Sequence, residues 1–278
     1  MKRLKIAAGF ICILLVLTGC NVPASPTQPE SPPSPPPAST PTPSETPPIP
    51  PKPSPTPRCI WETDVNYIDY SSPESYLVSG SQSNLNNQYS NQVNKYLRIK
   101  NNDINFIGEI FRWKQSYFRR YSAGGRFIGK ITVNQIMKKK ALSGCHDHGL
   151  VLVSILRKYG FPAIMVDAAG IQWAWDYSEG KREDFMGHVF VEVYVNGNWI
   201  LINSTSGEYV ENYDPCNSVI PMTSSDESKG YFALFKGLDP AEYGIKSNEQ
   251  LKEHLKVFTN RVKSIEIYFP RYDINKLP

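Results

Sequence analysis

The stretch from residue 143 to residue 205 changes from a helical to a strand-like hydrophobic pattern. Apolar residues first recur at helical spacing, at Leu150, Val151, Val153, Ile155 and Leu156. This period predicts an amphipathic helix with one buried face. Ser143 precedes the pattern as a predicted N-cap, whose hydroxyl can accept a hydrogen bond from an amide of the first turn. Gly160 and Pro162 follow it as the glycine and proline typical of a helix end.

A strand pattern follows the predicted helix. From Val189 to Val195 every second residue is a valine, and this period of two predicts a β-strand that begins at His188. Asn196-Gly197 comes next and is the dipeptide most typical of a two-residue type I′ turn. The pattern therefore predicts a β-hairpin whose second strand starts directly after the glycine.

The length of this turn decides which side chains share a face of the hairpin. With two loop residues, Phe190 lies opposite Asn203. Asn203 then lies on the same face as His188 and diagonal to it, within side-chain reach. A three-residue loop would shift the register by one residue and turn Asn203 to the other face. The sequence thus predicts a register in which Phe190 pairs with Asn203.

Three polar side chains here have the chemistry of a nucleophile, a base and an orienting group. Cys145 falls in the first turn of the predicted helix, where free amides and the helix dipole favour a thiolate. The pKa of a cysteine can fall there from about 8.5 to roughly 3.5–7.5. His188 can act as the general base and Asn203 can fix the imidazole tautomer. The alternatives are that His188 is a core histidine and that Asn203 merely ends its strand.

The stretch resembles the transglutaminase-like superfamily, whose members share a papain-like core. The matching residues are Gly144-Cys145 with Asp147, Arg157-x-x-Gly160-x-Pro162-Ala163, His188-x-Phe190-x-Glu192-Val193, and Gly197-x-Trp199 leading to Asn203. The resemblance implies an α+β fold in which the helix carrying the cysteine packs on an antiparallel sheet carrying the histidine and the asparagine. It implies a catalytic triad of Cys145, His188 and Asn203, and a structural role for the acidic Asp147.

One residue departs from the superfamily pattern. The third member of the triad is usually aspartate and is Asn203 here, although papain-like proteases use asparagine in that role. A neutral amide orients an imidazole but stabilises the imidazolium less than a carboxylate does.

The resemblance implies acyl transfer on amide bonds of protein or peptide substrates, with cell-wall peptide as one candidate. The Cys145 thiolate would attack the carbonyl and form an acyl-enzyme, which water or an amine then resolves. The same triad serves hydrolysis and cross-linking, so the residues do not separate these outcomes. The alternative class is a non-catalytic cell-envelope module that keeps the fold for binding. No cofactor motif is present, and we expect none.

The N-terminus has the features of an export signal. A charged start and the apolar run from Ile6 to Leu17 predict a signal peptide over residues 1–19. Leu-Thr-Gly before Cys20 resembles a bacterial lipobox, which implies lipidation of Cys20; the alternative is an ordinary signal peptide with a coincidental cysteine. Residues 20–58 hold 17 of the 24 prolines and predict an extended tether. We therefore expect an extracytoplasmic, membrane-anchored bacterial lipoprotein.

Residues 59–278 are long enough for one domain with a substantial core. The whole chain carries 30 Lys/Arg and 26 Asp/Glu. Without the five basic and two acidic residues of positions 1–58, the domain holds 25 and 24 and is nearly neutral. The basic surface typical of nucleic-acid-binding proteins is missing, so we expect no nucleic-acid partner.

The cysteine count agrees with export. Cys12 leaves with the signal peptide and Cys20 is the lipidation site, so three cysteines remain in the domain. An odd number means at least one free thiol. Cys59 with Cys216 is the pairing that leaves Cys145 free, and the alternative is that both stay unpaired.

Other side chains near the predicted site allow two interpretations. Trp173, Trp175 and Tyr177 either wall the substrate cleft or cover the edge of the core. Gln135 is a weak candidate for a second oxyanion donor beside the Cys145 amide.

Two histidines flank the nucleophile, and the run Cys-His-Asp-His resembles a metal-binding motif. Side chains at consecutive helical positions diverge around the helix, so His146 and His148 do not converge on one ion. We expect no metal site.

The rest of the domain yields coarser predictions. A helix capped by residues 101–103 would turn Arg112, Lys114, Arg119 and Arg120 to water. The remaining patterns predict a helix after Thr132 through Lys140, a strand at 163–166, a long loop at 167–186, a loop at 208–229, strands at 231–235 and 264–269, and a helix at 248–262.

Overall fold

A computed structural model describes residues 68–97, 103–120, 127–264 and 266–278. The chain divides into the units Met1–Lys52 and Pro53–Pro278, and every described residue belongs to the second. The predicted signal peptide, Cys20, the tether and Cys59 lie outside the described residues. Within the described part of the chain, no helix has the length and apolar character needed to cross a membrane.

The fold combines a seven-stranded antiparallel sheet with helices, which confirms the predicted α+β class. The strands of this sheet, in spatial order, are β7 (Val219–Ile220), β8 (Tyr231–Gly237), β3 (Ala163–Gly170), β4 (Gly187–Val195), β5 (Asn198–Asn203), β6 (Glu208–Val210) and β9 (Ile274–Lys276). Two short strands pair in parallel: β1 (Arg119–Arg120) and β2 (Ala141–Leu142).

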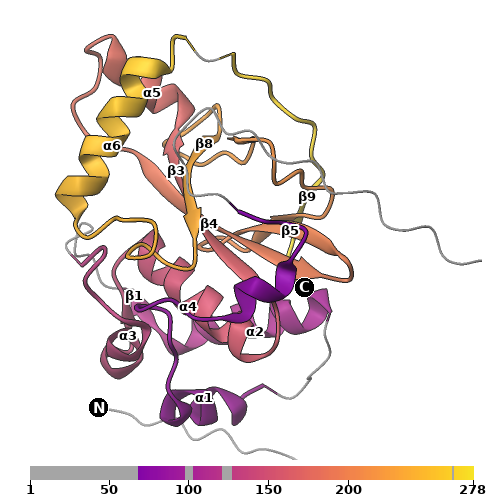
Figure 1. The fold of residues 1–278 in the computed structure, drawn as a ribbon. Coiled ribbons are helices and arrows are strands. Elements are labelled where there is room, and N and C mark those ends of the chain that lie inside the picture. The colour runs from indigo at the N-terminus through magenta and orange to yellow at the C-terminus, as the bar shows by residue number, and fades with distance from the viewer. Residues whose placement is uncertain (1–67, 98–102, 121–126, 265) are drawn as a thin grey trace, which may run out of the picture. The chain divides into compact units, whose positions relative to one another are not determined.

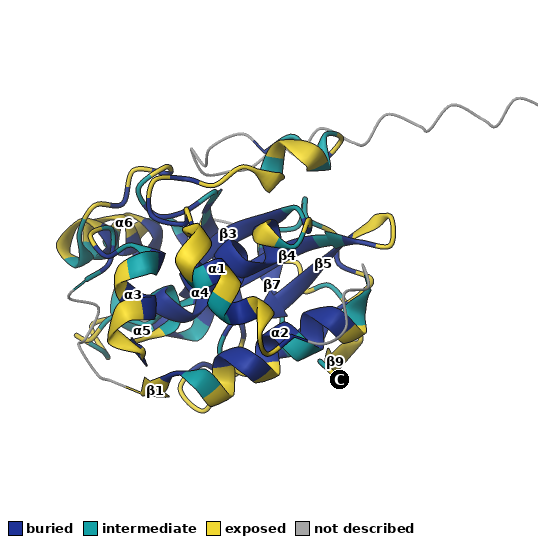
Figure 2. Cartoon of the chain, turned by 90° about the horizontal axis from the view of Figure 1, so that it is seen from below, coloured by how far each residue is buried: buried dark blue, intermediate teal, exposed yellow. Residues whose placement is uncertain are grey.

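The helices lie mainly along one face of this sheet. They are α1 (Asn87–Asn94), α2 (Ile104–Tyr117), α3 (Val133–Lys139), α4 (Cys145–Lys158), α5 (Ile171–Ser178) and α6 (Asn248–Arg261), with a 3-10 helix at Pro73–Leu77. Figure 1 shows α2 beside α4, whereas α5 and α6 pack together at the other end of the sheet. Figure 2 shows that burial is greatest in the central strands and along α4.

The β4–β5 hairpin has the predicted register. Asn196 and Gly197 both have positive φ, 52° and 85°, as a type I′ turn requires. Val195 pairs with Asn198 and Phe190 pairs with Asn203. The two-residue turn therefore sets the sheet face on which Asn203 lies.

Helix α4 begins one residue later than a Ser143 cap would place it. Its N-cap is Gly144, and Cys145 is the first helical residue. Ser143 does not cap the helix, because its hydroxyl donates to Asp147 Oδ2 at 2.7 Å and its amide donates to the same oxygen at 2.8 Å. The predicted cap is wrong, but the predicted structural role of Asp147 is confirmed. The helix ends at Lys158 with Tyr159 as its C-cap, and the predicted Gly160 follows with φ of +87°.

Helix α4 packs directly on strand β4. A Cβ added to Gly149 would lie 2.5 Å from Val189 Cγ1, so only glycine permits this approach. The main hydrophobic cluster lies between helices and sheet and includes Leu152 and Val191, and a second cluster with Phe190 covers the opposite face. The cysteine helix thus packs on the antiparallel sheet that carries His188 and Asn203.

Several predicted loops contain regular structure. Strand β3 continues to Gly170 and helix α5 follows, so most of the predicted 167–186 loop is ordered. Segment 208–229 contains β6 and β7. The strand predicted at 264–269 is wrong: no strand is assigned among its described residues, and the last strand is β9. These segments are short or alternate weakly, so tertiary pairing decides their structure.

Lys114 corrects the predicted solvated face of α2. Arg112, Arg119 and Arg120 are exposed as expected, but the Lys114 side chain is completely buried. Lys114 lies three residues after Phe111 in the buried stripe of the helix, and its Nζ lies 4.4 Å from the Phe111 ring centroid. Its position in the helical period, rather than its charge, decides its burial.

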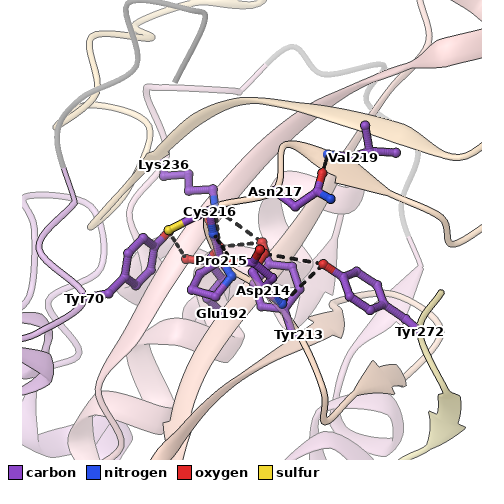
Figure 3. A network of polar contacts seen from close by, with 10 residues as sticks. All are labelled: Tyr70, Glu192, Tyr213, Asp214, Pro215, Cys216, Asn217, Val219, Lys236 and Tyr272. Carbon is purple, nitrogen blue, oxygen red and sulfur yellow. Dashed lines mark hydrogen bonds and ion pairs between the residues drawn. The ribbon is translucent and has the colours of Figure 1, made fainter. Parts of the chain in front are cut away.

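A buried ion pair connects strands β4 and β8 on either side of β3. Lys236 Nζ contacts the Glu192 carboxylate, and both side chains are fully buried. The same ammonium group donates to Tyr70 Oη at 2.9 Å and to the Pro215 carbonyl at 2.9 Å, as Figure 3 shows. Tyr213 donates to Glu192 at 2.7 Å. The network therefore joins the start of the described domain, the sheet and segment 213–216.

We expect Lys236→Met to lower the free energy of unfolding by about 3–5 kcal/mol, because it leaves the Glu192 charge buried without its cation. Urea unfolding followed by circular dichroism measures this change. The double variant Lys236→Met/Glu192→Gln should regain much of the loss, since it removes both charges. Equal stability of the single variant and the wild type would contradict the structural importance of this pair.

Candidate active site

Cys145 lies at the N-terminus of α4 and faces a cavity of about 200 Å³. It is the free cysteine in the described part of the chain, and its side chain is only partly buried. The first amides of a helix have no partner inside the helix, so they can stabilise a negative charge at this position. The cavity is lined by Ile128, Cys145, His146, Asp167, Ala168, Phe185, Gly187, Leu234, Asn248, Leu251, Lys252 and Leu255.

His188 and Asn203 are hydrogen-bonded partners. His188 Nε2 lies 2.9 Å from Asn203 Oδ1. The amides of Thr205 and Ser206 also donate to Oδ1, at 3.1 and 3.2 Å, which identifies that atom as the amide oxygen. Because this oxygen only accepts, Nε2 carries the proton, and Nδ1 remains for the Cys145 thiol. The hairpin register thus produces an orienting contact for the imidazole.

The structure brings a second imidazole to the same sulfur. His146 Nδ1 lies 3.9 Å from Cys145 Sγ. Its Nε2 lies 2.8 Å from one oxygen of Asp167 and 3.0 Å from the other. The Tyr243 hydroxyl donates to the same carboxylate. The sequence interpretation gave His146 no role and placed Asp167 in a loop, so it missed this contact.

These neighbours change the acidity of Cys145. Burial alone would raise the pKa of the thiol, but hydrogen bonds and charge interactions with His146 and His188 outweigh it and lower the pKa to about 6. Burial opposes protonation of both imidazoles as well. The Asp167 carboxylate nevertheless raises the pKa of His146 well above its usual 6.5. Contact with the sulfur and with Asn203 raises the pKa of His188. The site therefore favours a thiolate beside imidazolium.

His148 points away from His146 and contacts a different partner. Lys114 Nζ lies 3.1 Å from His148 Nδ1 and also donates to the Ser204 carbonyl, directly after Asn203. Burial lowers the pKa of Lys114 to about 7, and burial together with Lys114 lowers the pKa of His148 to about 3. In the described ranges no group of three or more His, Cys, Asp or Glu side chains is arranged to hold a metal ion.

The weaker sequence candidates do not line the cavity. Gln135 has a different role from the predicted one: its Oε1 accepts from the Thr132 amide at 2.9 Å and completes the capping box of α3. Trp173 is completely buried and donates to the Asp184 carbonyl at 2.7 Å. Trp175 and Tyr177 pack against the main core. None of the four lines the cavity, whereas Phe185 does.

Cys216 is disulfide-bonded in the structure. Cys59, its predicted partner, lies outside the described residues, so the pairing stays a prediction. The bond leaves Cys145 without a competing free thiol in the described part of the chain.

Comparisons with known proteins add little to this geometry. No family model matches the chain, and no curated protein matches it. The solved structures that it resembles include a proposed cysteine protease from Cytophaga hutchinsonii, with a TM-score of 0.43 and 15% sequence identity. The match covers 64% of this chain and 50% of that chain, so the chain spans about half the length of this neighbour. A similarity this low carries no functional conclusion, and the function has to be inferred from the site itself.

The buried His148 predicts a specific acid dependence of stability. Unfolding returns its pKa from about 3 toward 6.5, so between these values the unfolded state binds a proton that the folded state does not. Stability should then fall as pH falls through this window, by about 1.4 kcal/mol per unit. His148→Gln should make the slope shallower in urea unfolding between pH 6.5 and 4.

His254→Gln is the matched control, because His254 is exposed on α6. It should leave the slope unchanged. Identical slopes in wild type and His148→Gln would contradict the buried neutral state of His148.

Proposed function

We propose that this chain is a cysteine enzyme that acts on amide bonds of protein or peptide substrates through Cys145, His188 and Asn203. The observation that carries the proposal is the orientation of His188: Nε2 donates to Asn203 Oδ1, which leaves Nδ1 for a thiol whose pKa is lowered to about 6. The α+β fold with its cysteine helix on the sheet supports a transglutaminase-like domain over residues 59–278.

The reaction proceeds through an acyl-enzyme. The Cys145 thiolate attacks the amide carbonyl, the S–C bond forms, and the carbonyl π electrons move to oxygen. The Cys145 amide at the start of α4 can donate to this oxyanion. Protonated His188 then transfers its Nδ1 proton to the leaving nitrogen as the C–N bond breaks. In the second half, neutral His188 takes a proton from water or an amine while that oxygen or nitrogen bonds to the acyl carbonyl carbon. The carbonyl then re-forms, the C–S bond breaks, and the thiolate is restored beside protonated His188.

The cavity beside Cys145 suits one side chain of a substrate. Phe185, Leu234, Leu251 and Leu255 make much of its wall apolar, and Lys252 supplies a cation. The cavity volume of about 200 Å³ is smaller than the roughly 300–1,000 Å³ of pockets that enclose a whole small molecule. This supports a peptide whose backbone stays outside while one apolar or acidic side chain enters.

The sequence supports an extracytoplasmic, membrane-anchored location for this enzyme. We infer that Cys20 is lipidated and that residues 20–58 separate the domain from the bilayer. An extended chain of this composition spans ~3.1 Å per residue, so the tether would reach roughly 100 Å. Such a reach suits substrates in the cell envelope, including cell-wall peptide.

The pH dependence of Cys145 alkylation tests the triad. The full chain is treated with iodoacetamide from pH 4 to pH 9, and labelling is assigned by peptide mapping. Because the thiolate is the reactive form, we expect the labelling rate to rise with a midpoint of about 6. His188→Ala should move the midpoint upward. A midpoint near 8.5 that His188→Ala leaves unchanged would refute the triad and favour a non-catalytic binding module.

Substrate assays then separate hydrolysis from transfer. The chain is incubated with a glutamine-rich protein, with and without a fluorescent primary amine. Fluorescence on the protein indicates acyl transfer, and new peptide fragments indicate hydrolysis. Both signals should disappear in Cys145→Ala, and a signal that persists in this variant belongs to a contaminant.

A further inference from the structure

The His146 ring connects a carboxylate to the reactive sulfur. One nitrogen contacts Asp167 at 2.8 Å, and the other lies 3.9 Å from Cys145 Sγ. This is the same connection, from acid through imidazole to nucleophile, by which a catalytic triad works. Side-chain exposure is 11% for His146 and 4% for Asp167, so water screens the pair very little. The pair is thus placed to act on the sulfur.

A hydrogen bond and a strand irregularity set the position of the Asp167 carboxylate. Tyr243, from the segment before α6, donates its hydroxyl to Asp167 Oδ2. The ladder between β3 and β8 shifts register between Asp167 and Ala168. Irregularities of this kind re-aim side chains and are common beside active sites. Asp167 follows Met165 on the helix-facing side of β3, which is the side toward α4.

Charged and titratable groups reach this cluster from several elements. His188 comes from β4, Tyr231 from β8 and Tyr243 from the segment before α6, and Lys252 of α6 lines the same cavity. Proximity to Cys145 contributes to the raised pKa of both tyrosines, after burial as the main cause, so both remain neutral donors. Asp167 is the carboxylate that contacts His146, whereas His188 contacts the amide oxygen of Asn203.

We propose that Asp167 and His146 form a second imidazole pair, beside His188 and Asn203, that acts on the Cys145 sulfur. The two histidines then have different roles toward one nucleophile. His146 is a catalytic residue that stays protonated beside the thiolate, and Asp167 is its positioning residue. His188 is the residue that gives and takes the proton. This inference depends on the proposed function, because both histidines serve the same nucleophile.

The partners of the two rings explain this division. A carboxylate binds imidazolium strongly, so His146 gives up its proton reluctantly and suits a fixed cation. A neutral amide stabilises imidazolium less than a carboxylate does, so His188 gives up its proton more readily than His146, as general acid–base catalysis requires. Asn203 is then matched to its role, since the negative charge that an aspartate would supply at position 203 comes from Asp167 instead.

The charges of the resting site balance under this assignment. Asp167 and the Cys145 thiolate each carry one negative charge, and protonated His146 and His188 each carry one positive charge. In the chain from Asp167 through His146 and Cys145 to His188, opposite charges alternate. This arrangement reduces the cost of burying them, because each charge has an adjacent partner.

Asp167→Asn tests the pair, because it keeps the shape and removes the charge. We expect the midpoint of Cys145 alkylation to rise by at least about one pH unit, equivalent to a tenfold change in the thiolate equilibrium. Asp147→Asn is the matched control: Asp147 is a buried acid two residues from Cys145, but it binds Ser143. The control should leave the midpoint near that of the wild type. If Asp167→Asn and the wild type show the same midpoint of Cys145 alkylation, the second pair is overturned and the proposed triad is unaffected.

Nitrogen NMR of the full chain gives a second test, in which Asp167 is left unchanged. The chain holds four histidines, so ¹⁵N-histidine labelling yields four ring spectra, and His146→Gln identifies the ring of interest. We expect His146 to be imidazolium at pH 7.5, both before and after Cys145 is blocked with iodoacetamide. His188 should lose its raised pKa when the sulfur is blocked, because the thiolate is then gone.

The outcomes separate the two ideas. A neutral His146 ring at pH 7.5, with His188 still responding to the blocked sulfur, would overturn the second pair and keep the proposed triad. An unresponsive His188, together with an alkylation midpoint near 8.5, would refute the proposed function itself.

Discussion

The two-residue turn at Asn196-Gly197 is the constraint on which the candidate site depends. Because side chains alternate along a strand, one residue more or less in this turn would send Asn203 to the other face and leave His188 without its orienting oxygen. The second constraint is the contact of Gly149 with Val189, which sets how closely α4 approaches β4. The turn and the glycine thus help to place Cys145 near His188, although the two residues are 43 positions apart in the sequence.

Several polar and charged side chains are buried in this fold, and they have different roles. The Lys236–Glu192 pair holds strands together, and Lys114 fixes the Ser204 carbonyl at the end of β5. The contact between His146 and Asp167 instead faces the cavity. Buried ions are costly unless each has a partner. The contact between His146 and Asp167 therefore gives each of these two groups beside the cavity a partner.

The features that could be predicted from the sequence are those that neighbouring residues in the chain determine. The helix end before Gly160, the hairpin register and strand β4 all depend on residues that are close in the chain, and all are confirmed. The burial of Lys114 and the contact of His146 with Asp167 join distant segments, and no local pattern encodes them. One signal was available: Asp167 continues the run of buried residues that starts at Ala163, and a lone acid in such a strand needs a partner.

The two described cysteines are in different redox states: Cys145 is a free thiol and Cys216 is disulfide-bonded. A partly exposed thiolate at Cys145 is readily oxidised to sulfenic acid, and no second free thiol in the described part of the chain is present to rescue it as a disulfide. The Cys216 sulfur is instead held in a disulfide, and the carbonyl of its neighbour Pro215 accepts from the buried Lys236. The protein therefore needs surroundings in which one sulfur stays reduced while the other stays bonded.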